Sequence, residues 1–345
     1  MKTIVKQVAG IDVAQKELVV SLGRMYDNWT PEVYSNRSFA NTPKGFTDLI
    51  GWIQKLTEES IGVGYVMEAT GVYHEPLAYF LEAAGYAVSI VLPNKISNYI
   101  RTLDIKTITD KTASEAITRF GLERKLNRWK RPKGIYKTLK QLTRERDQLV
   151  EERTMVKNQL HAEQAEAEPN VSSKTRLSRR IAFLNEQEKE IKAEIAVLAR
   201  QDEEVNKSVE LISSIPGIGS LTAVTVLAET NGFELISNKK QLVSYSGLDV
   251  KEKQSGTSVK GKPRISKRGN RQLRKAMHLP ALAAIRHEER FKAIFARLVS
   301  KHGIKMKAAV AVQRKLLEMI YIIWKTGNPY DQEYLQKNTT NKGAI

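Results

Sequence analysis

The chain has 345 residues, of which 41% are hydrophobic, so it is long enough for two globular domains with buried cores. Its formal net charge of +18 indicates a polyanionic partner, because each phosphate that a Lys or Arg neutralises releases condensed counterions. Nucleic acid is the expected partner, and an anionic membrane surface is the alternative. The absence of cysteine excludes disulfides, cysteine-ligated zinc and thiol nucleophiles. Without a membrane-length apolar stretch or a signal-peptide pattern, we expect a cytoplasmic protein that does not bind membranes.

Residues 1–130 have the pattern of an α/β domain. A helix is predicted over 75–84, with Gly85 as its C-cap, and a second over 109–120. Strands that alternate with helices predict a sheet covered by helices. The short β-runs lie at 8–13, 18–22, 33–39, 62–67 and 86–92.

Residues 131–207 have a different periodicity, in which apolar positions recur at alternating spacings of four and three. Arg146 and Arg153 interrupt the first apolar stripe, and Glu188 interrupts the second. We expect two long helices, because each stripe is too narrow for burial in a globular core. They form either a coiled coil that joins two chains or an isolated antiparallel hairpin that acts as a spacer.

Residues 208–328 are predicted to form a compact helical domain, and residues 329–345 a disordered tail. The domain opens with Ile215-Pro-Gly-Ile-Gly219, which resembles a helix-hairpin-helix element. A glycine turn of this kind lets backbone N–H groups at a helix start approach a phosphate. We therefore predict nucleic-acid contacts at Pro216, Gly217 and Gly219. A tight turn between two packed helices is the alternative.

Two short segments are predicted to contact phosphates. Residues 260–275 carry eight basic side chains and no acidic one, which is unusual for an ordinary solvated face. Residues 128–131 place one aromatic among cations, which suits RNA stacking, although a solvated helix end explains them as well. The predicted contact residues are Lys260, Lys262, Arg264, Lys267, Arg268, Asn270, Arg271, Arg274, Arg128, Trp129, Lys130 and Arg131.

Carboxylates interrupt two otherwise apolar strands. Asp12 lies inside the first predicted strand, and Glu68 follows the run 62–67 just before a glycine turn. An ionised carboxylate in such a place is costly unless it binds a cation. Together with Asp110 at the start of a helix, the two acids could share Mg²⁺, as in ribonuclease H-like nucleases that use two metals. Taken singly, the three acids are equally well explained as a strand-end cap, a turn acid and a helix N-cap.

The same segments resemble the DEDD transposases of the IS110 family, and the IS1111 branch best. The matching residues are Gly10-Ile-Asp-Val-Ala-Gln, Glu68-Ala-Thr-Gly-Val-Tyr, Thr109-Asp-Lys-Thr and Ala116-Ile-Thr-Arg-Phe. The resemblance implies a RuvC-like domain with four metal-binding acids. Three of them fall on Asp12, Glu68 and Asp110, and the fourth falls on Ala113.

With one metal ligand replaced by alanine, we expect a chain that binds DNA and cleaves it poorly, through engineered or natural inactivation. Glu115 and Asp104 are the nearby acids that could substitute for the missing ligand. Glu115 would point about 200° around the helix from Ala113, so we favour inactivation.

Near the C-terminus, Tyr245-Ser-Gly-Leu-Asp, Gln254-Ser-Gly256 and Arg264-Ile-Ser-Lys-Arg-Gly-Asn270 resemble the serine transposase domain of the same family. The resemblance implies a serine that works with the acidic site, and we place it at Ser255. A serine hydroxyl becomes a nucleophile when a base, a metal or a cationic field favours its alkoxide, and the basic segment supplies such a field. Ser246, Ser258 and Ser266 are competitors. His278 and His287 are expected to pack or to contact phosphate.

The resemblance thus implies an RNA-guided DNA recombinase of a bacterial insertion sequence, associated with the nucleoid. Its serine attacks a DNA phosphodiester to give a transient phosphoserine link, and the strand is then joined to a new partner. The implied partners are element ends and target DNA, a noncoding guide RNA encoded by the element, and further copies of the chain in a dimer or tetramer. In such an oligomer the serine of one protomer can meet the acids of another.

Two alternatives stay open. One is a RuvC-like endonuclease for Holliday junctions that uses the acids alone and does not need Ser255. The other is a non-catalytic nucleic-acid-binding protein, which Ala113 favours.

Overall fold

A computed structural model describes residues 2–69, 71–103, 105, 107–234, 236–252, 254–255, 259–261 and 263–332, with only the backbone of residues 254, 255, 259 and 260. The chain forms two compact units, Met1–Arg131 and Pro132–Ile345. The predicted disordered tail lies outside the described residues from position 333 onward. Within the described residues, no helix combines the length and apolarity that a bilayer crossing requires.

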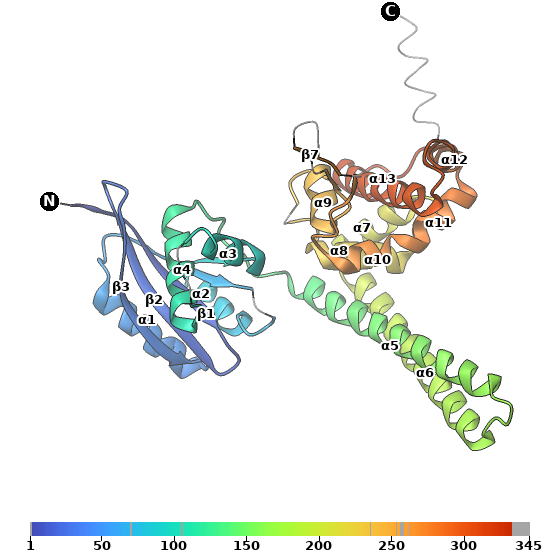
Figure 1. Cartoon of the computed structure of the whole chain (residues 1–345), viewed down its shortest axis with the longest axis horizontal. Helices are drawn as coiled ribbons and strands as arrows, with labels where there is room; N and C mark the ends of the chain where they lie inside the picture. Colours follow the sequence, from blue (N-terminus) through green and yellow to red (C-terminus); the bar gives the residue numbers. More distant parts are fainter. Residues whose placement is uncertain are drawn as a thin grey trace, which may run out of the picture. The chain divides into compact units, whose positions relative to one another are not determined.

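The first unit is built on a mixed five-stranded sheet with the order β3-β2-β1-β4-β5 (Figure 1). β2 is antiparallel to both of its neighbours, β1 and β3, whereas β4 pairs parallel with β1, and β5 pairs parallel with β4. All five strands were predicted, but the first two extend further, because polar residues such as Lys6, Gln7 and Arg24 interrupt the apolar runs there. Their bounds are Ile4–Val13, Glu17–Tyr26, Pro31–Ala40, Val63–Glu68 and Ala87–Val91.

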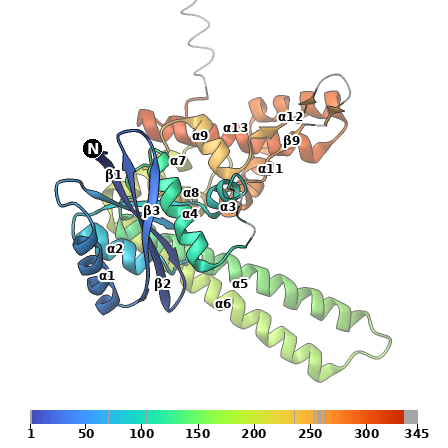
Figure 2. The same ribbon diagram turned by 60° about the vertical axis from the view of Figure 1, so that its left-hand side comes forward.

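Helices cover both faces of the sheet (Figure 2). α1 and α2 pack on the face that receives Ile11 and Met67, whereas α3 and α4 pack on the face that receives Val8 and Val66. The predicted α/β class is confirmed, although α1 and α3 were not anticipated. The four helices are Pro43–Leu56, Glu75–Ala83, Pro93–Ile100 and Asp110–Glu123.

Small residues let α4 lie close against β1, with the two elements running in opposite directions. A Cβ on Gly10 would lie 2.3 Å from the backbone nitrogen of Thr118. The Thr118 hydroxyl donates to the carbonyl of Ser21 at 3.0 Å, and Nζ of Lys6 donates to the Leu122 carbonyl at 3.1 Å near the helix end. Because Lys6 meets the end of α4 and Gly10 its middle, the start of α4 lies towards Asp12.

In the second unit, α5 (Gly134–Ala165) and α6 (Val171–Gln201) form an antiparallel hairpin (Figures 1 and 2). The polar residues that interrupt the two apolar stripes bind one another. The carboxylate of Glu188, 5% exposed, accepts hydrogen bonds from Arg146 and Arg153 and pairs with Lys192 at 2.7 Å.

Burial raises the pKa of Glu188, but the hydrogen bonds from Lys192, Arg146 and Arg153 together outweigh it and hold that pKa at about 2. These interactions join the apolar stripe of α5 to the stripe of α6 in the same chain, which agrees with the hairpin interpretation. Coiled-coil geometry and dimerisation through this region stay predictions.

The remainder of the second unit is a helical domain around one large core, which also takes in Leu139 of α5 and Ile195 of α6. Its helices are α7 Glu203–Ser213, α8 Ser220–Thr230, α9 Lys239–Ser246, α10 Arg271–Ala276, α11 His278–His287, α12 Glu289–His302 and α13 Lys305–Thr326. Four short strands between α9 and α10 are β6 Val250–Lys251, β7 Gln254–Ser255, β8 Val259–Lys260 and β9 Arg264–Ile265.

Candidate active site in two parts

The structure brings Asp12 and Glu68 to neighbouring positions of the sheet. Ile11 and Met67 are register partners in the parallel pair β1 and β4, and each acid is the next residue along its strand. Strand alternation directs both acids to the side of the sheet that carries α4, since Val66 packs on that side and Gly10 meets Thr118 there.

Asp110 supplies the third carboxylate at the first residue of α4, where its side chain is exposed. The helix start is fixed by Thr109, whose hydroxyl accepts from the backbone N–H of Thr112 at 3.3 Å, while the Thr112 hydroxyl accepts from the Thr109 N–H at 2.7 Å. Thr109 is therefore the N-cap of α4. The alternative interpretation of Asp110 as a helix N-cap is wrong.

The charges of the other two acids act on the Asp12 carboxylate. Burial, followed by the charges of Asp110 and Glu68, raises the pKa of Asp12 to about 6. Such a cluster favours a divalent cation, because the cation would relieve both the repulsion and the cost of burial. Among the described side chains, however, no three acids, histidines or cysteines are gathered tightly enough to hold a metal. The charges of Asp110 and Glu68 thus act on Asp12 although the three acids do not form a closed ligand shell.

We expect Asp12→Asn to stabilise the metal-free protein above pH 6, because the folded state disfavours the Asp12 carboxylate. The folded pKa lies above the ordinary value of 3.8, so stability falls as pH rises from about 4 to about 6. The gain should be on the order of 1 kcal/mol, since the side chain is partly exposed. Thermal denaturation in EDTA at pH 7.5 and pH 4 measures it. An equal shift at both pH values would contradict the account.

Ala113 lies one turn after Asp110, on the side of α4 that faces the sheet. Residues 110, 113, 114 and 117 share a helical stripe, and Ser114 and Ile117 are fully buried against the sheet. An aspartate at position 113 would therefore project from the same stripe as Asp110. Asp104, one of the two acids considered as a substitute, lies outside the described residues.

The described part of residues 250–265, which we name the serine arm, contains four two-residue strands. At its base β6 pairs with β9, and further out β7 pairs with β8. Ser255 is the last residue of β7 and is the register partner of Val259. The side chain of Ser255 lies outside the described part, as do Gly256, Ser258 and Lys262. The two-residue strands were not predicted, because so short a ribbon leaves no periodicity to detect.

The flanking motif residues close the base of the serine arm. The backbone N–H of Asn270 donates to the Tyr245 carbonyl at 2.7 Å, and that of Lys267 donates to the Gly247 carbonyl at 3.0 Å. Gly269 has φ +148°, and a Cβ there would lie 2.4 Å from the Tyr245 oxygen. Only glycine fits this approach. The two motifs that flank the Ser-Gly pair therefore hold both ends of the arm together.

Two of the competing serines have other roles in the structure. Ser246 is fully buried, and its hydroxyl donates to the Val243 carbonyl at 2.8 Å. The Ser266 hydroxyl donates to Asp249 at 2.5 Å and accepts from the backbone N–H of Arg268. His278 interacts with the side chain of Gln313 at 3.0 Å. The hydroxyls of Ser246 and Ser266 are thus both engaged in hydrogen bonds within the domain.

A buried carboxylate, absent from the sequence-based site, ties the arm to the rest of the unit. The Glu229 side chain is 0% exposed and takes two hydrogen bonds from Arg144 of α5, at 2.7 and 3.0 Å. Asn270 donates to the same carboxylate at 2.7 Å, and its own oxygen caps α10. Burial raises the pKa of Glu229, but Arg144 and Asn270 outweigh burial and lower it. No local pattern identifies Glu229, since its partners are distant in sequence.

The predicted phosphate contacts divide into exposed and engaged side chains. Arg264, Lys267, Arg268 and Arg271 are exposed. Arg274 instead donates to the carbonyl of Ser246 at 2.7 Å. The backbone of Lys260 lies in β8. The exposed group therefore lies on the serine arm and on the segment that closes its base.

Three of the four residues in the segment 128–131 contact other residues of the first unit. The Trp129 ring stacks on Tyr79 at 5.6 Å between centroids, and the Arg131 guanidinium lies 4.6 Å from the same Tyr79 ring. Arg128 donates to the Gly85 carbonyl at 3.0 Å, whereas the Lys130 side chain is exposed. RNA contact by these residues stays a prediction.

The predicted helix-hairpin-helix element is a turn between α7 and α8. Gly217 has φ +88°, and a Cβ there would lie 2.8 Å from the Pro280 carbonyl, so its lack of a side chain serves packing against α11. Pro216 is half-buried in the turn. Gly219, the N-cap of α8, has open space around it.

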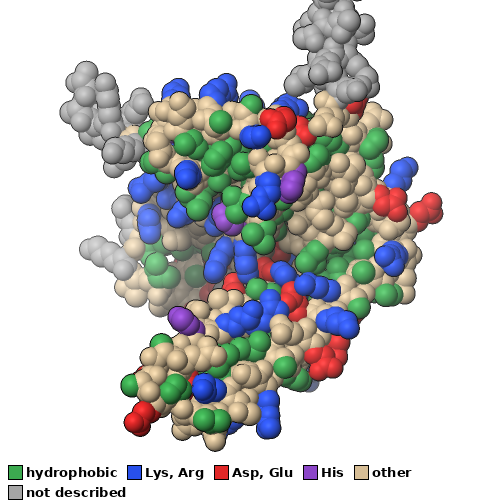
Figure 3. Space-filling view, turned by 90° about the vertical axis from the view of Figure 1, so that its right-hand side faces the viewer, with side chains coloured by type: hydrophobic (Ala, Val, Ile, Leu, Met, Phe, Trp, Pro, Cys, Tyr) green, Lys and Arg blue, Asp and Glu red, His purple; other side chains and the backbone are tan. Residues whose placement is uncertain are grey.

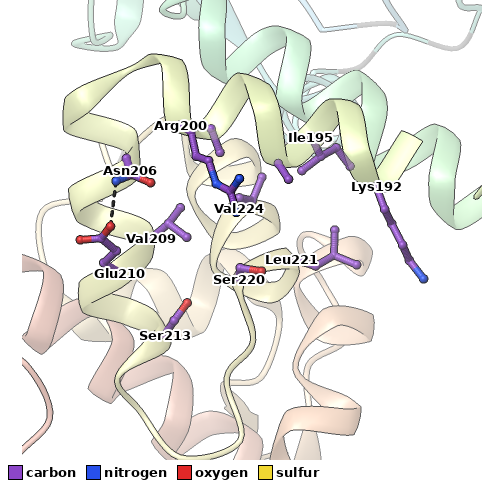
Figure 4. A pocket seen from close by; sticks show the side chains of 12 residues that line it. Lys192, Ile195, Arg200, Asn206, Val209, Glu210, Ser213, Ser220, Leu221 and Val224 are labelled. Atoms are coloured by element: carbon purple, nitrogen blue, oxygen red, sulfur yellow. Dashed lines mark hydrogen bonds between the residues drawn. The ribbon is translucent and has the colours of Figure 1, made fainter. Parts of the chain in front are cut away.

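A cavity of about 460 Å³ lies beside this turn, lined by residues of α6, α7 and α8 that include Arg200, Ser213 and Ser220 (Figure 4). Its most distinctive polar atom is the buried Ser213 hydroxyl, which has no hydrogen-bond partner among the described atoms. Phosphate contact at Pro216, Gly217 and Gly219 stays a prediction.

Comparison with known proteins shows which chains share this organisation. A family model described as "Transposase IS116/IS110/IS902 family" matches residues 209–296, and a DEDD transposase model of IS110 type matches residues 9–164. The pilin gene-inverting proteins of Moraxella lacunata and Moraxella bovis are both 28% identical to this chain. These alignments cover 88% and 95% of this chain and 92% and 98% of the relatives.

The transposase of insertion element IS1111A from Coxiella burnetii is 30% identical, over 43% of this chain and 39% of its own length. Among solved structures, RuvC of Thermus thermophilus matches with a TM-score of 0.26 and 10% identity. That match covers 32% of this chain and 90% of RuvC.

Proposed function

Because this chain belongs to the IS110 family of transposases, we propose that it is a DNA strand-transfer enzyme whose active site has two parts. One part is the acidic cluster of Asp12, Glu68 and Asp110, and the other is Ser255 on the serine arm. The observation that carries the proposal is the placement of Asp12 and Glu68 at neighbouring positions of the sheet, on the side covered by α4. There burial, followed by the charges of Asp110 and Glu68, raises the pKa of Asp12.

In the acidic part, Asp12, Glu68 and Asp110 would hold Mg²⁺, which when bound polarises the phosphodiester and favours an attacking alkoxide. Asp12 must lose its proton for this role, so metal binding should strengthen as pH rises through about 6. The closed arm base supports this role of Ser255, and the exposed cations Arg264, Lys267 and Arg268 would favour its alkoxide and bind phosphate.

The covalent step follows from these groups. The Ser255 oxygen attacks the DNA phosphorus, and the bond from phosphorus to the departing strand oxygen breaks, leaving a serine phosphodiester and a free strand end. Attack by a hydroxyl of the new partner strand reverses the link. Since phosphodiester bonds are exchanged one for one, no external energy source is needed.

The partners we propose are element ends and target DNA, together with a noncoding guide RNA and further copies of the chain in a dimer or tetramer. The basic arm and Gly219 would contact DNA phosphates, and residues 128–131 would contact the RNA. The reaction takes place on bacterial DNA in the cytoplasm. With Ala113 in place of the fourth acid, this chain binds its DNA and turns over slowly.

Replacing Ser255 separates strand transfer from simple cleavage by the acids. In a background that carries Ala113→Asp, we expect Ser255→Ala to abolish joining of donor ends to target DNA, because no covalent link can form. Ser258→Ala, in the same arm, is the matched control and should retain joining. Both are measured by recombination of a donor and a target duplex with Mg²⁺. If Ser255→Ala still cleaved and joined DNA, an endonuclease that uses the acids alone would be the better description.

A further inference from the structure

The outer half of α6 exposes an aromatic ring among arginines. Phe183 is 58% exposed, and Arg176, Arg179 and Arg180 are exposed as well. We name these four residues the Arg-Phe face. In Figure 3 the outer end of the hairpin points towards the reader in the lower part of the view, where Lys and Arg side chains are spread over it.

The Arg-Phe face does not belong to the seam of the hairpin. At 100° per residue its four side chains fall within an arc of about 100°. Leu184 and Glu188, which face α5, lie about 90° and about 130° away from the middle of that arc. From 171 to 185 the sequence contains four basic residues and no acidic one. Arg180 also reaches Glu152 of α5 at 3.3 Å, an exposed pair that contributes little to stability. Phe183, Arg176 and Arg179 are thus exposed to solvent, and the weak pair of Arg180 with Glu152 can give way to a phosphate.

The chemistry of the face fits nucleic acid with unpaired bases. Arginine guanidinium groups bind phosphate, which explains the charge but not the ring. An exposed phenylalanine gains most from a flat partner, and a base offers its flat surface only when it is unstacked. Duplex DNA keeps those surfaces covered, whereas the loops of a structured RNA expose them.

We propose that the Arg-Phe face is an RNA-binding surface, on which Phe183 stacks with an unpaired base and the arginines hold the flanking phosphates. This proposal rests on the proposed function, in which RNA is the partner that keeps single-stranded nucleotides. It assigns the outer half of the hairpin a binding role in addition to that of a spacer, at a place far along the chain from residues 128–131.

Binding of poly(U) RNA by the full chain tests the proposal without any cleavage. We expect Phe183→Ser to weaken binding roughly tenfold or more, with an unchanged dependence on salt, because stacking is removed and charge is kept. The double variant Arg176→Glu, Arg179→Glu should also weaken binding. Its plot of log affinity against log salt should be shallower by about 0.7 for each phosphate that is no longer neutralised. Lys189→Glu is the matched control, since Lys189 is exposed on another face of α6.

A photoreactive benzoyl-phenylalanine in place of Phe183 identifies the occupant directly, and we expect its crosslink on the RNA. Equal RNA affinity of the wild type and Phe183→Ser would overturn the proposal, as would crosslinks to a second copy of the chain or only to duplex DNA. Because Phe183 is exposed, each variant should keep the wild-type melting temperature, which excludes misfolding as the cause. Strand transfer is assayed separately with duplex donor ends. A failure of the proposed function would appear as a loss of strand transfer, whereas a failure of the RNA-binding proposal would appear only in the RNA-binding assay.

Discussion

Restoring Ala113→Asp should raise metal-dependent cleavage of donor-end DNA on the order of a hundredfold or more, because it returns a carboxylate to the stripe of α4 that carries Asp110. The backbone at this position is already that of a regular helix, with the Ala113 N–H donating to the Thr109 carbonyl at 2.8 Å, so the change needs no refolding. Initial rates of strand cleavage with Mg²⁺ measure the effect.

Ala113→Asn is the matched control, since it has almost the same size and hydrogen-bonding capacity but no charge. It should leave cleavage near the level of the unmodified chain. If the aspartate and asparagine variants cleaved equally, or if the unmodified chain already matched the aspartate variant, position 113 would not be the missing ligand. The three acids present would then be sufficient.

The second large effect is expected at Arg144. We predict that Arg144→Met lowers the free energy of unfolding of the second unit by about 3 kcal/mol, because it leaves the carboxylate of Glu229 buried without its cation. In the wild type the pKa of Glu229 lies below its ordinary value, so the pair stabilises the fold at neutral pH and its contribution fades as pH falls through that lowered pKa. In the variant, burial without Arg144 raises that pKa, and protonation relieves the penalty.

The destabilisation should therefore be largest at pH 7 and smaller at pH 5, as measured by urea denaturation at the two pH values. Arg180→Met, which removes the exposed pair with Glu152, is the control and should cost less than about 1 kcal/mol at both. A destabilisation at Arg144 that did not depend on pH would mean that poorer packing, and not the unpaired Glu229 carboxylate, accounts for it.

Much of the first unit could be predicted from sequence because its strands are local apolar runs. Asp12 and Glu68 stood out since each interrupts such a run, and the parallel register of β1 and β4 then brings them side by side. α1 was missed although Thr42 caps it and Pro43 begins it. Its amphipathic pattern is short and lies between two strands whose apolar runs give a stronger local signal.

Long-range polar contacts could not be predicted, since they depend on which segments meet in space. Arg146 and Glu188 each looked like a defect in an apolar stripe, and only the hairpin shows that they bind each other. Glu229 had no distinguishing sequence pattern for the same reason. Burial could not be predicted either, because Ser246 lies in a Ser-Gly pair like that of Ser255, and only the structure shows that Ser246 is enclosed in the core.

The covalent link between Ser255 and DNA is the most direct measure of whether the two parts make one active site. The Ala113→Asp chain is incubated with donor-end DNA and Mg²⁺, and the nucleotide-bearing peptide is identified by mass spectrometry. The account predicts that the adduct lies on Ser255, and that it disappears when Asp12→Asn is added because the acids no longer activate the attack. An adduct on another residue, cleavage with no adduct at all, or an adduct that forms equally well without Asp12 would contradict it.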